Sequence, residues 1–83
     1  MTSPDTIRQC LLAQVQQRGI DKTICPSEVA RALGGEHWRS LMEAVRNAGK
    51  ALATEGKIVV TQRGQIVDPN QAKGPIRYRW TGN

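Results

Sequence analysis

Charged and polar side chains recur at helical spacing between residues 39 and 50. The members expected to share or border one helix face are Arg39, Ser40, Arg46, Asn47 and Lys50. Arginine can pair two donors with guanine, asparagine can pair with adenine, and lysine and serine can reach phosphates. This pattern predicts a face that enters the major groove of DNA. The alternative is a solvated face with ion pairs one turn apart, which Glu43 favours because its carboxylate repels phosphate.

A second candidate site is the turn expected at Arg63-Gly64, which Gln62 and Gln65 flank. A long cationic side chain at the tip of a hairpin can lie along a phosphate backbone or enter a minor groove. The alternative is a plain hairpin turn with polar residues. Because the arginine adjoins a glycine in a basic region, the sequence favours a DNA contact.

Arg77 and Arg79 alternate with apolar residues in a final expected strand, 76–80. They could extend the basic surface, or they could be edge-strand charges that prevent aggregation. The interleaving of arginines with Tyr78 and Trp80 also resembles an RNA-stacking surface. However, a chain without phenylalanine needs its aromatic residues inside, so we expect Trp38 and Tyr78 in the core.

Other chemistry has little support in the sequence. His37 stands alone beside a helix start, and the spacing of Cys10 and Cys25 matches no zinc pattern. Phosphate-binding loops and nucleophile motifs are absent. We therefore expect no enzyme activity, no cofactor and no metal site. The cysteines are expected as reduced thiols in the cytoplasm, since Asp5 and Arg8 interrupt any signal peptide and no run of about 20 apolar residues could span a membrane.

The net charge of +5 is unevenly placed along the chain. Basic and acidic residues balance over 1–37, so all of the excess positive charge lies in 38–83. A basic region invites a polyanion, and nucleic acid is the commonest one. The alternative is that a small soluble protein is mildly basic for solubility.

The helices and strands that must position these side chains can be predicted from the spacing of apolar residues and from the glycines and prolines that interrupt it. Helices are predicted over 4–18, from Pro26 to the Gly34-Gly35 pair, and from Glu36 to about Glu55. Gly49 lies inside the last of these, and we expect it to allow close packing, for example against the first helix. Strands are predicted over 58–62 and 76–80, with a short return strand at 66–67 and an extended link at 21–24. The order predicts one α+β domain over 1–83, a winged helix-turn-helix of three helices followed by a small antiparallel hairpin or sheet.

The sequence also resembles a family of short bacterial proteins catalogued as a domain of unknown function. The motifs that carry the resemblance span residues 25–77: Pro26-Ser27-Glu28-Val29-Ala30, Trp38-Arg39, Leu41-Met42, Val45-Arg46, Gly56, Ile58, Val60-Thr61-Gln62, Gly64, Val67-Asp68-Pro69 and Lys73-Gly74-Pro75-Ile76-Arg77. The resemblance implies a winged-helix fold. It supplies no activity and therefore carries no functional residues over.

Together these observations predict a small DNA-binding protein, such as a transcriptional regulator, that acts as a monomer or weak homodimer on double-stranded DNA. The predicted contacts are Arg39, Ser40, Arg46, Asn47, Lys50, Gln62, Arg63, Gln65 and Arg77. The main alternative is a protein-interaction module that docks a partner through Val59, Ile66 and Val67. RNA binding through Tyr78 and Trp80 is a third hypothesis.

Overall fold

The first helix, α1 (Pro4–Arg18), begins and ends where the sequence predicts. The computed structural model describes residues 2–83. Ser3 Oγ accepts a hydrogen bond from the backbone N–H of Thr6 at 3.2 Å, so it caps the helix start. Gly19 ends the helix with a φ of 96°, a conformation that glycine adopts without steric cost. The helix buries Ile7, Leu11 and Val15 along one stripe.

The second helix, α2 (Pro26–Gly34), follows the two-residue strand β1 (Thr23–Ile24). Pro26 suits the first helical turn because its missing N–H would have no partner there. Glu28 folds back, and its Oε2 accepts the backbone N–H of Cys25 at 2.7 Å. This contact fixes the point at which the extended link becomes a helix.

The segment after α2 differs from the prediction of one continuous helix from Glu36. Gly35–Leu41 forms a 3-10 helix, η1, with a non-helical conformation at His37, and α3 (Met42–Thr54) begins only after it. A 3-10 turn stacks side chains three residues apart, so Trp38 and Leu41 face the same way. Both lie against Gly34, where an added Cβ would stand 2.9 Å from Leu41 Cδ1. The tighter helix is explained by this packing of η1 onto the end of α2.

Four strands form one antiparallel sheet of order β1-β4-β2-β3. The strands that follow α3 are β2 (Ile58–Gln62), β3 (Gln65–Ile66) and β4 (Arg77–Trp80). β4 is central, since Tyr78 is paired with both Ile24 and Val60. Arg77 and Arg79 therefore do not protect a sheet edge, and that interpretation is wrong. The sequence could not exclude the edge-strand interpretation, because β4 pairs with a strand more than fifty residues earlier and no pattern near Arg77 reveals that pairing.

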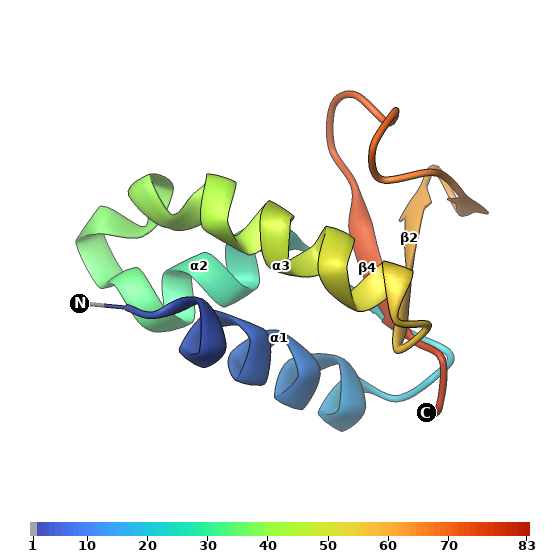
Figure 1. Ribbon diagram of the computed structural model, residues 1–83, viewed down its shortest axis with the longest axis horizontal. Coiled ribbons are helices and arrows are strands. Elements are labelled where there is room, and N and C mark those ends of the chain that lie inside the picture. Colours follow the sequence, from blue (N-terminus) through green and yellow to red (C-terminus); the bar gives the residue numbers. More distant parts are fainter. Residues whose placement is uncertain (1) are drawn as a thin grey trace.

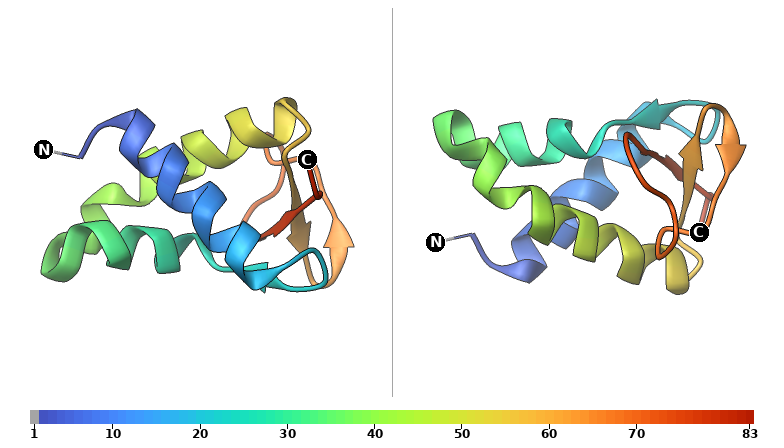
Figure 2. Two further views of the ribbon diagram at one scale, coloured as in Figure 1. Left: turned by 90° about the horizontal axis from the view of Figure 1, so that it is seen from below. Right: turned by 90° about the horizontal axis from the view of Figure 1, so that it is seen from above.

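The helices gather at one end of the molecule and the sheet stands at the other, as Figure 1 shows. The two views in Figure 2 show α1 crossing the α2–α3 pair, with the strands packed against the ends of the helices. The buried core joins both parts: Ile7, Leu11, Val15, Ile24, Val29, Ala30, Val45, Leu52, Ile58, Val60, Ile76 and Tyr78. The predicted α+β class is confirmed.

Gly49 lets the sheet approach α3 closely. A Cβ at this position would lie 2.5 Å from Tyr78 Oη and 2.6 Å from Tyr78 Cζ. The partner is thus β4 and not the first helix, which corrects the sequence-based expectation. Tyr78 itself is 1% exposed, so its predicted place in the core is confirmed.

The burial of Tyr78 makes stability depend on pH. Burial raises the pKa of Tyr78 to about 12, from an ordinary value of 10.0. Because the folded-state pKa is the higher one, this contribution to stability is complete below about pH 10 and is lost as pH rises through about 12. We expect the urea midpoint to fall over that range in the wild type and to fall less in Tyr78→Phe.

Absorbance of the tyrosinate reports the ionisation directly, because the chain has one tyrosine. A folded protein in which this residue titrates near its ordinary pKa would contradict the prediction. Equal pH dependence in the wild type and Tyr78→Phe would contradict it as well.

Candidate functional site

The predicted hairpin turn is present, and Arg63 stands at its tip. Gln62 pairs with Gln65 across a two-residue turn, in which Arg63 has a φ of 54° and Gly64 a φ of 80°. Positive φ at both central residues matches the twist of the flanking strands, but it favours asparagine or glycine over arginine at the first of them. The exposed tip thus holds an arginine at a position whose positive φ favours asparagine or glycine.

The loop after β3 folds back onto this hairpin. Val67 N donates to Val60 O at 2.9 Å, and Gln62 Nε2 donates to the carbonyls of Lys73 and Pro75. We refer to residues 58–76, from β2 to the end of this loop, as the hairpin segment. Gln62 was predicted as a DNA contact, but its amide nitrogen holds the loop, so its place in the structure points to a positioning role.

The anchored loop brings Lys73 and Arg77 to the same region as Arg63. Two neighbouring hollows, of about 550 and 460 Å³, share Gln62, Arg63 and Lys73 in their walls. The remaining lining residues are Cys25, Gln65, Val67, Gly74, Pro75, Ile76 and Arg77. These hollows have no carboxylate in their linings, so the charged side chains that an anion would meet there are all cationic. Lys73 was missing from the predicted contacts because only the fold of the loop places it beside Arg63.

Arg77 is held in place by β1. Its Nε donates to Thr23 Oγ1 at 2.6 Å, and its Nη2 lies 3.4 Å from Thr23 O. The guanidinium is exposed and still borders the hollow beside Cys25. Arg77 is therefore a fixed cation at the border of the hairpin segment.

The exposed face of α3 supplies further predicted residues. Arg46 and Lys50 are exposed and one helical turn apart. Arg46 lies one helical turn before Gly49, the residue of α3 that packs against Tyr78. Its charge acts to lower the pKa of Tyr78, against the larger effect of burial. Arg46 is thus on the side of α3 that meets the sheet. Asn47 instead lines a separate groove of about 280 Å³ against α1, so α3 does not present it with Arg46.

Two of the predicted contact residues, Arg39 and Ser40, precede α3. Arg39 and Ser40 belong to η1, after its non-helical residue His37, and α3 begins at Met42. Ser40 Oγ donates to the carbonyl of His37 at 2.7 Å. Arg39 Cζ lies 4.4 Å from the centroid of the Trp38 ring. Arg39 therefore lies in a different element from Arg46 and Lys50, and its guanidinium is stacked on Trp38.

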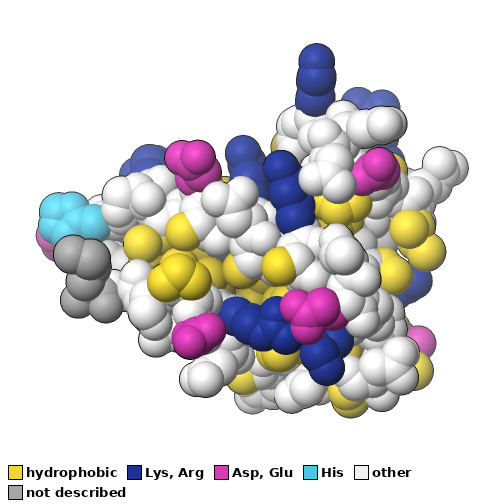
Figure 3. Space-filling model, viewed as in Figure 1, with side chains coloured by type: hydrophobic (Ala, Val, Ile, Leu, Met, Phe, Trp, Pro, Cys, Tyr) yellow, Lys and Arg dark blue, Asp and Glu magenta, His cyan; other side chains and the backbone are white. Residues whose placement is uncertain are grey.

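Figure 3 shows that lysine and arginine side chains gather along the upper side of α3 and over the hairpin segment, with acidic side chains standing among them. Within residues 2–83, the ion pairs are Arg8–Glu55 and Arg18–Glu28, and both arginines come from α1. The basic side chains of α3 and of the hairpin segment thus have no ion-pair partner in the described part of the chain. Glu43 on α3 is exposed and is the nearest acidic residue in sequence to Arg46.

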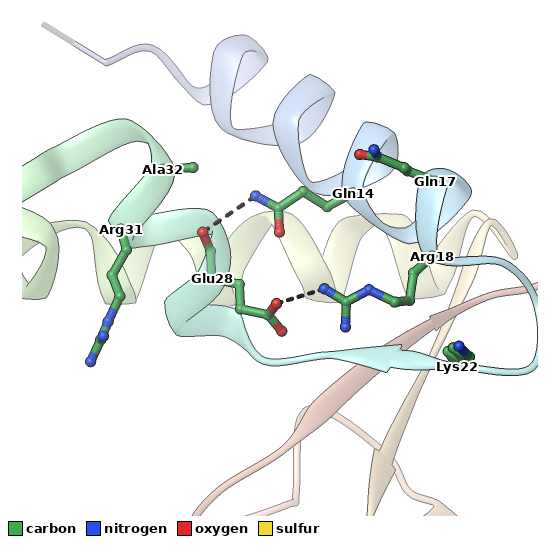
Figure 4. Close-up of a pocket in the computed structure, with 7 residues that line it drawn as sticks. All are labelled: Gln14, Gln17, Arg18, Lys22, Glu28, Arg31 and Ala32. Carbon is green, nitrogen blue, oxygen red and sulfur yellow. Dashed lines mark hydrogen bonds and ion pairs between the residues drawn. The ribbon is translucent and has the colours of Figure 1, made fainter.

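A larger hollow, of about 820 Å³, lies between α1 and α2 (Figure 4). Arg18 Nη2 pairs with Glu28 Oε1 across it at 2.8 Å, and Gln14 Nε2 donates to Glu28 O at 3.3 Å. Burial acts to raise the pKa of Glu28, but the hydrogen bond from Cys25 and the Arg18 pair outweigh it, so that the pKa is lowered. The Glu28 carboxylate, at the centre of this hollow, therefore has a structural role as the ion-pair partner of Arg18. None of the predicted contacts lines this hollow.

The structure gives no new support to the other kinds of chemistry. Across residues 2–83, His, Cys, Asp and Glu side chains form no group of three or more that could hold a metal ion. The helices of this part of the chain are too short or too polar to cross a membrane. Tyr78 is buried and Trp80 is half-buried, so the RNA-stacking hypothesis loses the exposed pair of aromatic rings that it requires.

A comparison with protein families matches residues 4–81 to a model described as "Protein of unknown function (DUF3253)". The predicted resemblance to a family of unknown function is thereby confirmed. No curated protein matches the chain.

Proposed function

Since the chain belongs to the DUF3253 family of proteins of unknown function, we propose a function from its geometry. The protein is a small winged-helix protein that binds double-stranded DNA. α3 lies in the major groove, and the hairpin segment is the wing on the phosphate backbone. The proposal includes a cytoplasmic location, a role in transcription regulation and a monomeric or weakly dimeric state.

One observation carries the proposal: cations from α3 and the hairpin segment have no ion-pair partner among residues 2–83, whereas Arg8 and Arg18 on α1 are paired. Pairing these charges within the protein would add little to the free energy of unfolding, because a surface ion pair contributes at most about 1 kcal/mol. The same charges gain much from a polyanion, because each phosphate contact releases counterions. A basic surface without ion-pair partners is therefore better explained by binding to a polyanion than by a contribution to folding stability.

The side chains divide the work in this proposal. Arg46 pairs two donors with a guanine edge, and Lys50, one turn further, contacts phosphate. Arg63 and Lys73 contact the backbone from the hairpin segment, with Gln65 beside them. Arg77, tied to Thr23, adds a fixed charge at the border.

A titration of isotope-labelled protein with a mixed-sequence DNA duplex tests the proposal. We expect backbone amide shifts to cluster over 42–50 and 62–73 at low salt and to fade near physiological salt, because phosphate contacts dominate nonspecific affinity. Amides of α1 serve as the internal control and should not move. If no amide moves even at low salt, the basic surface does not bind duplex DNA.

The protein-interaction module stays as the second candidate because of Ile66. This side chain is 65% exposed on β3, which is an edge of the sheet. Val59 and Val67 are half-buried, so the docking edge is smaller than the sequence predicted. Capture of a protein partner that Ile66→Thr abolishes, together with unchanged amides in the DNA titration, would favour this second function.

A further inference from the structure

A pair of arginines is stacked on one tryptophan at the end of the molecule remote from the hairpin segment. Arg31 Cζ lies 4.5 Å and Arg39 Cζ 4.4 Å from the centroid of the Trp38 ring. Arg31 comes from α2 and the other two residues from η1. We call these three residues the Trp38 stack.

The Trp38 stack holds two like charges together with no acidic group of residues 2–83 at ion-pair distance of either. Both arginines are exposed, and neither takes part in the ion pairs found within residues 2–83. Glu28 lines a hollow with Arg31 but is paired with Arg18, and Glu36 forms no ion pair with either arginine. A site that gathers positive charge in this way favours an anion.

Stacking also prepares these side chains for binding. A guanidinium over an aromatic face keeps its N–H groups free at its edges and loses part of its rotational freedom in advance. A phosphate that binds it then costs less conformational entropy than one that binds a free arginine. Figure 4 shows the Arg31 side chain extending from α2 away from α1, and so away from the Arg18–Glu28 pair.

The position of the stack relative to α3 favours duplex DNA as the source of that phosphate. η1 and the hairpin segment lie at opposite ends of the longest axis, with α3 running between them (Figure 1). That axis measures 32 Å, which is longer than the roughly 12 Å width of a major groove. A duplex with α3 in its major groove has a phosphate backbone on each side of that groove, and the two ends of the molecule extend far enough to meet both.

We infer that the Trp38 stack is a second phosphate anchor for duplex DNA, at the other end of α3 from the hairpin segment. The inference rests on the proposed function and deepens it. The hairpin segment and the Trp38 stack then contact the phosphate backbones on either side of the groove that α3 enters.

Binding of a labelled mixed-sequence duplex, measured by fluorescence polarisation between about 50 and 200 mM salt, tests this anchor. Arg31→Gln should lower the slope of log affinity against log salt by about 0.9 and weaken binding about tenfold at the low-salt end. Lys22→Gln is the matched control, because Lys22 lines the same hollow as Arg31 and carries the same charge. We expect Lys22→Gln to leave the slope unchanged.

Trp38→Leu separates stacking from charge. It keeps both arginines but frees them, so we expect severalfold weaker binding with the protein still folded by circular dichroism. If Trp38→Leu does not fold, Arg39→Gln replaces it and should behave as Arg31→Gln does.

Equal slopes for Arg31→Gln and Lys22→Gln would overturn the anchor while leaving the proposed function in place. A wild-type protein that binds no duplex at any salt concentration would overturn the proposed function itself.

Discussion

Replacing Gly49 with alanine is expected to lower the free energy of unfolding by about 3 kcal/mol, the upper part of the range for overpacked cores. Helix propensity alone would give the opposite sign, since alanine is favoured over glycine by about 1 kcal/mol inside a helix. The packing term dominates because the new methyl group would lie 2.5 Å from Tyr78 Oη and 2.8 Å from Tyr78 Cε1. Tyr78 is 1% exposed and part of the core, so its ring cannot move aside.

Urea denaturation followed by circular dichroism measures this effect. Ala51→Gly, at an exposed position of α3, calibrates helix propensity and should cost about 1 kcal/mol. A Gly49→Ala protein that is as stable as the wild type, or more stable, would show that α3 and β4 do not pack as closely as described.

The double variant Arg46→Ala/Arg63→Asn is expected to weaken duplex binding on the order of a hundredfold at about 50 mM salt, with the salt slope reduced by about 1.8. One charge is lost from α3 and one from the hairpin tip. Asparagine is chosen at position 63 because it tolerates positive φ, so the turn is kept. Fluorescence polarisation with a mixed-sequence duplex provides the measurement.

The control for this variant is Arg8→Ala/Lys22→Asn, which removes the same net charge from the α1 side of the molecule. Its affinity should stay within a few-fold of the wild type. If both double variants weaken binding equally, net charge alone governs the interaction, and the α3 and hairpin surface has no special role.

The parts of the fold that depend on local signals were predicted well from the sequence. Ser3 and Gly19 mark the ends of α1, Pro26 marks the start of α2, and the Arg63-Gly64 pair marks a turn. Each of these signals acts within a few residues. A cap, a proline or a positive φ has the same effect whatever the rest of the chain does.

The errors arose where distant parts of the chain decide the local structure. η1 is a 3-10 helix because Trp38 and Leu41 pack on Gly34, and Gly49 faces β4 because the sheet places Tyr78 there. Neither contact can be read from periodicity.

The prediction of the site residues was limited by the same dependence on contacts between distant parts of the chain. Arg46, Lys50 and Arg63 could be selected by residue type and spacing, and the structure leaves them exposed. Arg39 was expected in one long helix with Arg46 but belongs to η1 and stacks on Trp38. Lys73 was missed because only the bonds from Gln62 bring its loop to Arg63. Charge type is visible in a sequence, but the surface on which a charge lies depends on tertiary contacts.

The central position of β4 has a consequence for how the chain folds during synthesis. β4 pairs with both β1 and β2, and Arg77 follows Thr23, its bonding partner in β1, by 54 residues. The helices can contact one another before β4 emerges, whereas β1 and β2 must wait for it with their inner edges unpaired. Such distant pairing slows folding, and an unpaired strand edge invites association between nascent chains. The yield of native protein in a cell therefore depends on how quickly β4 enters the gap between its two neighbours.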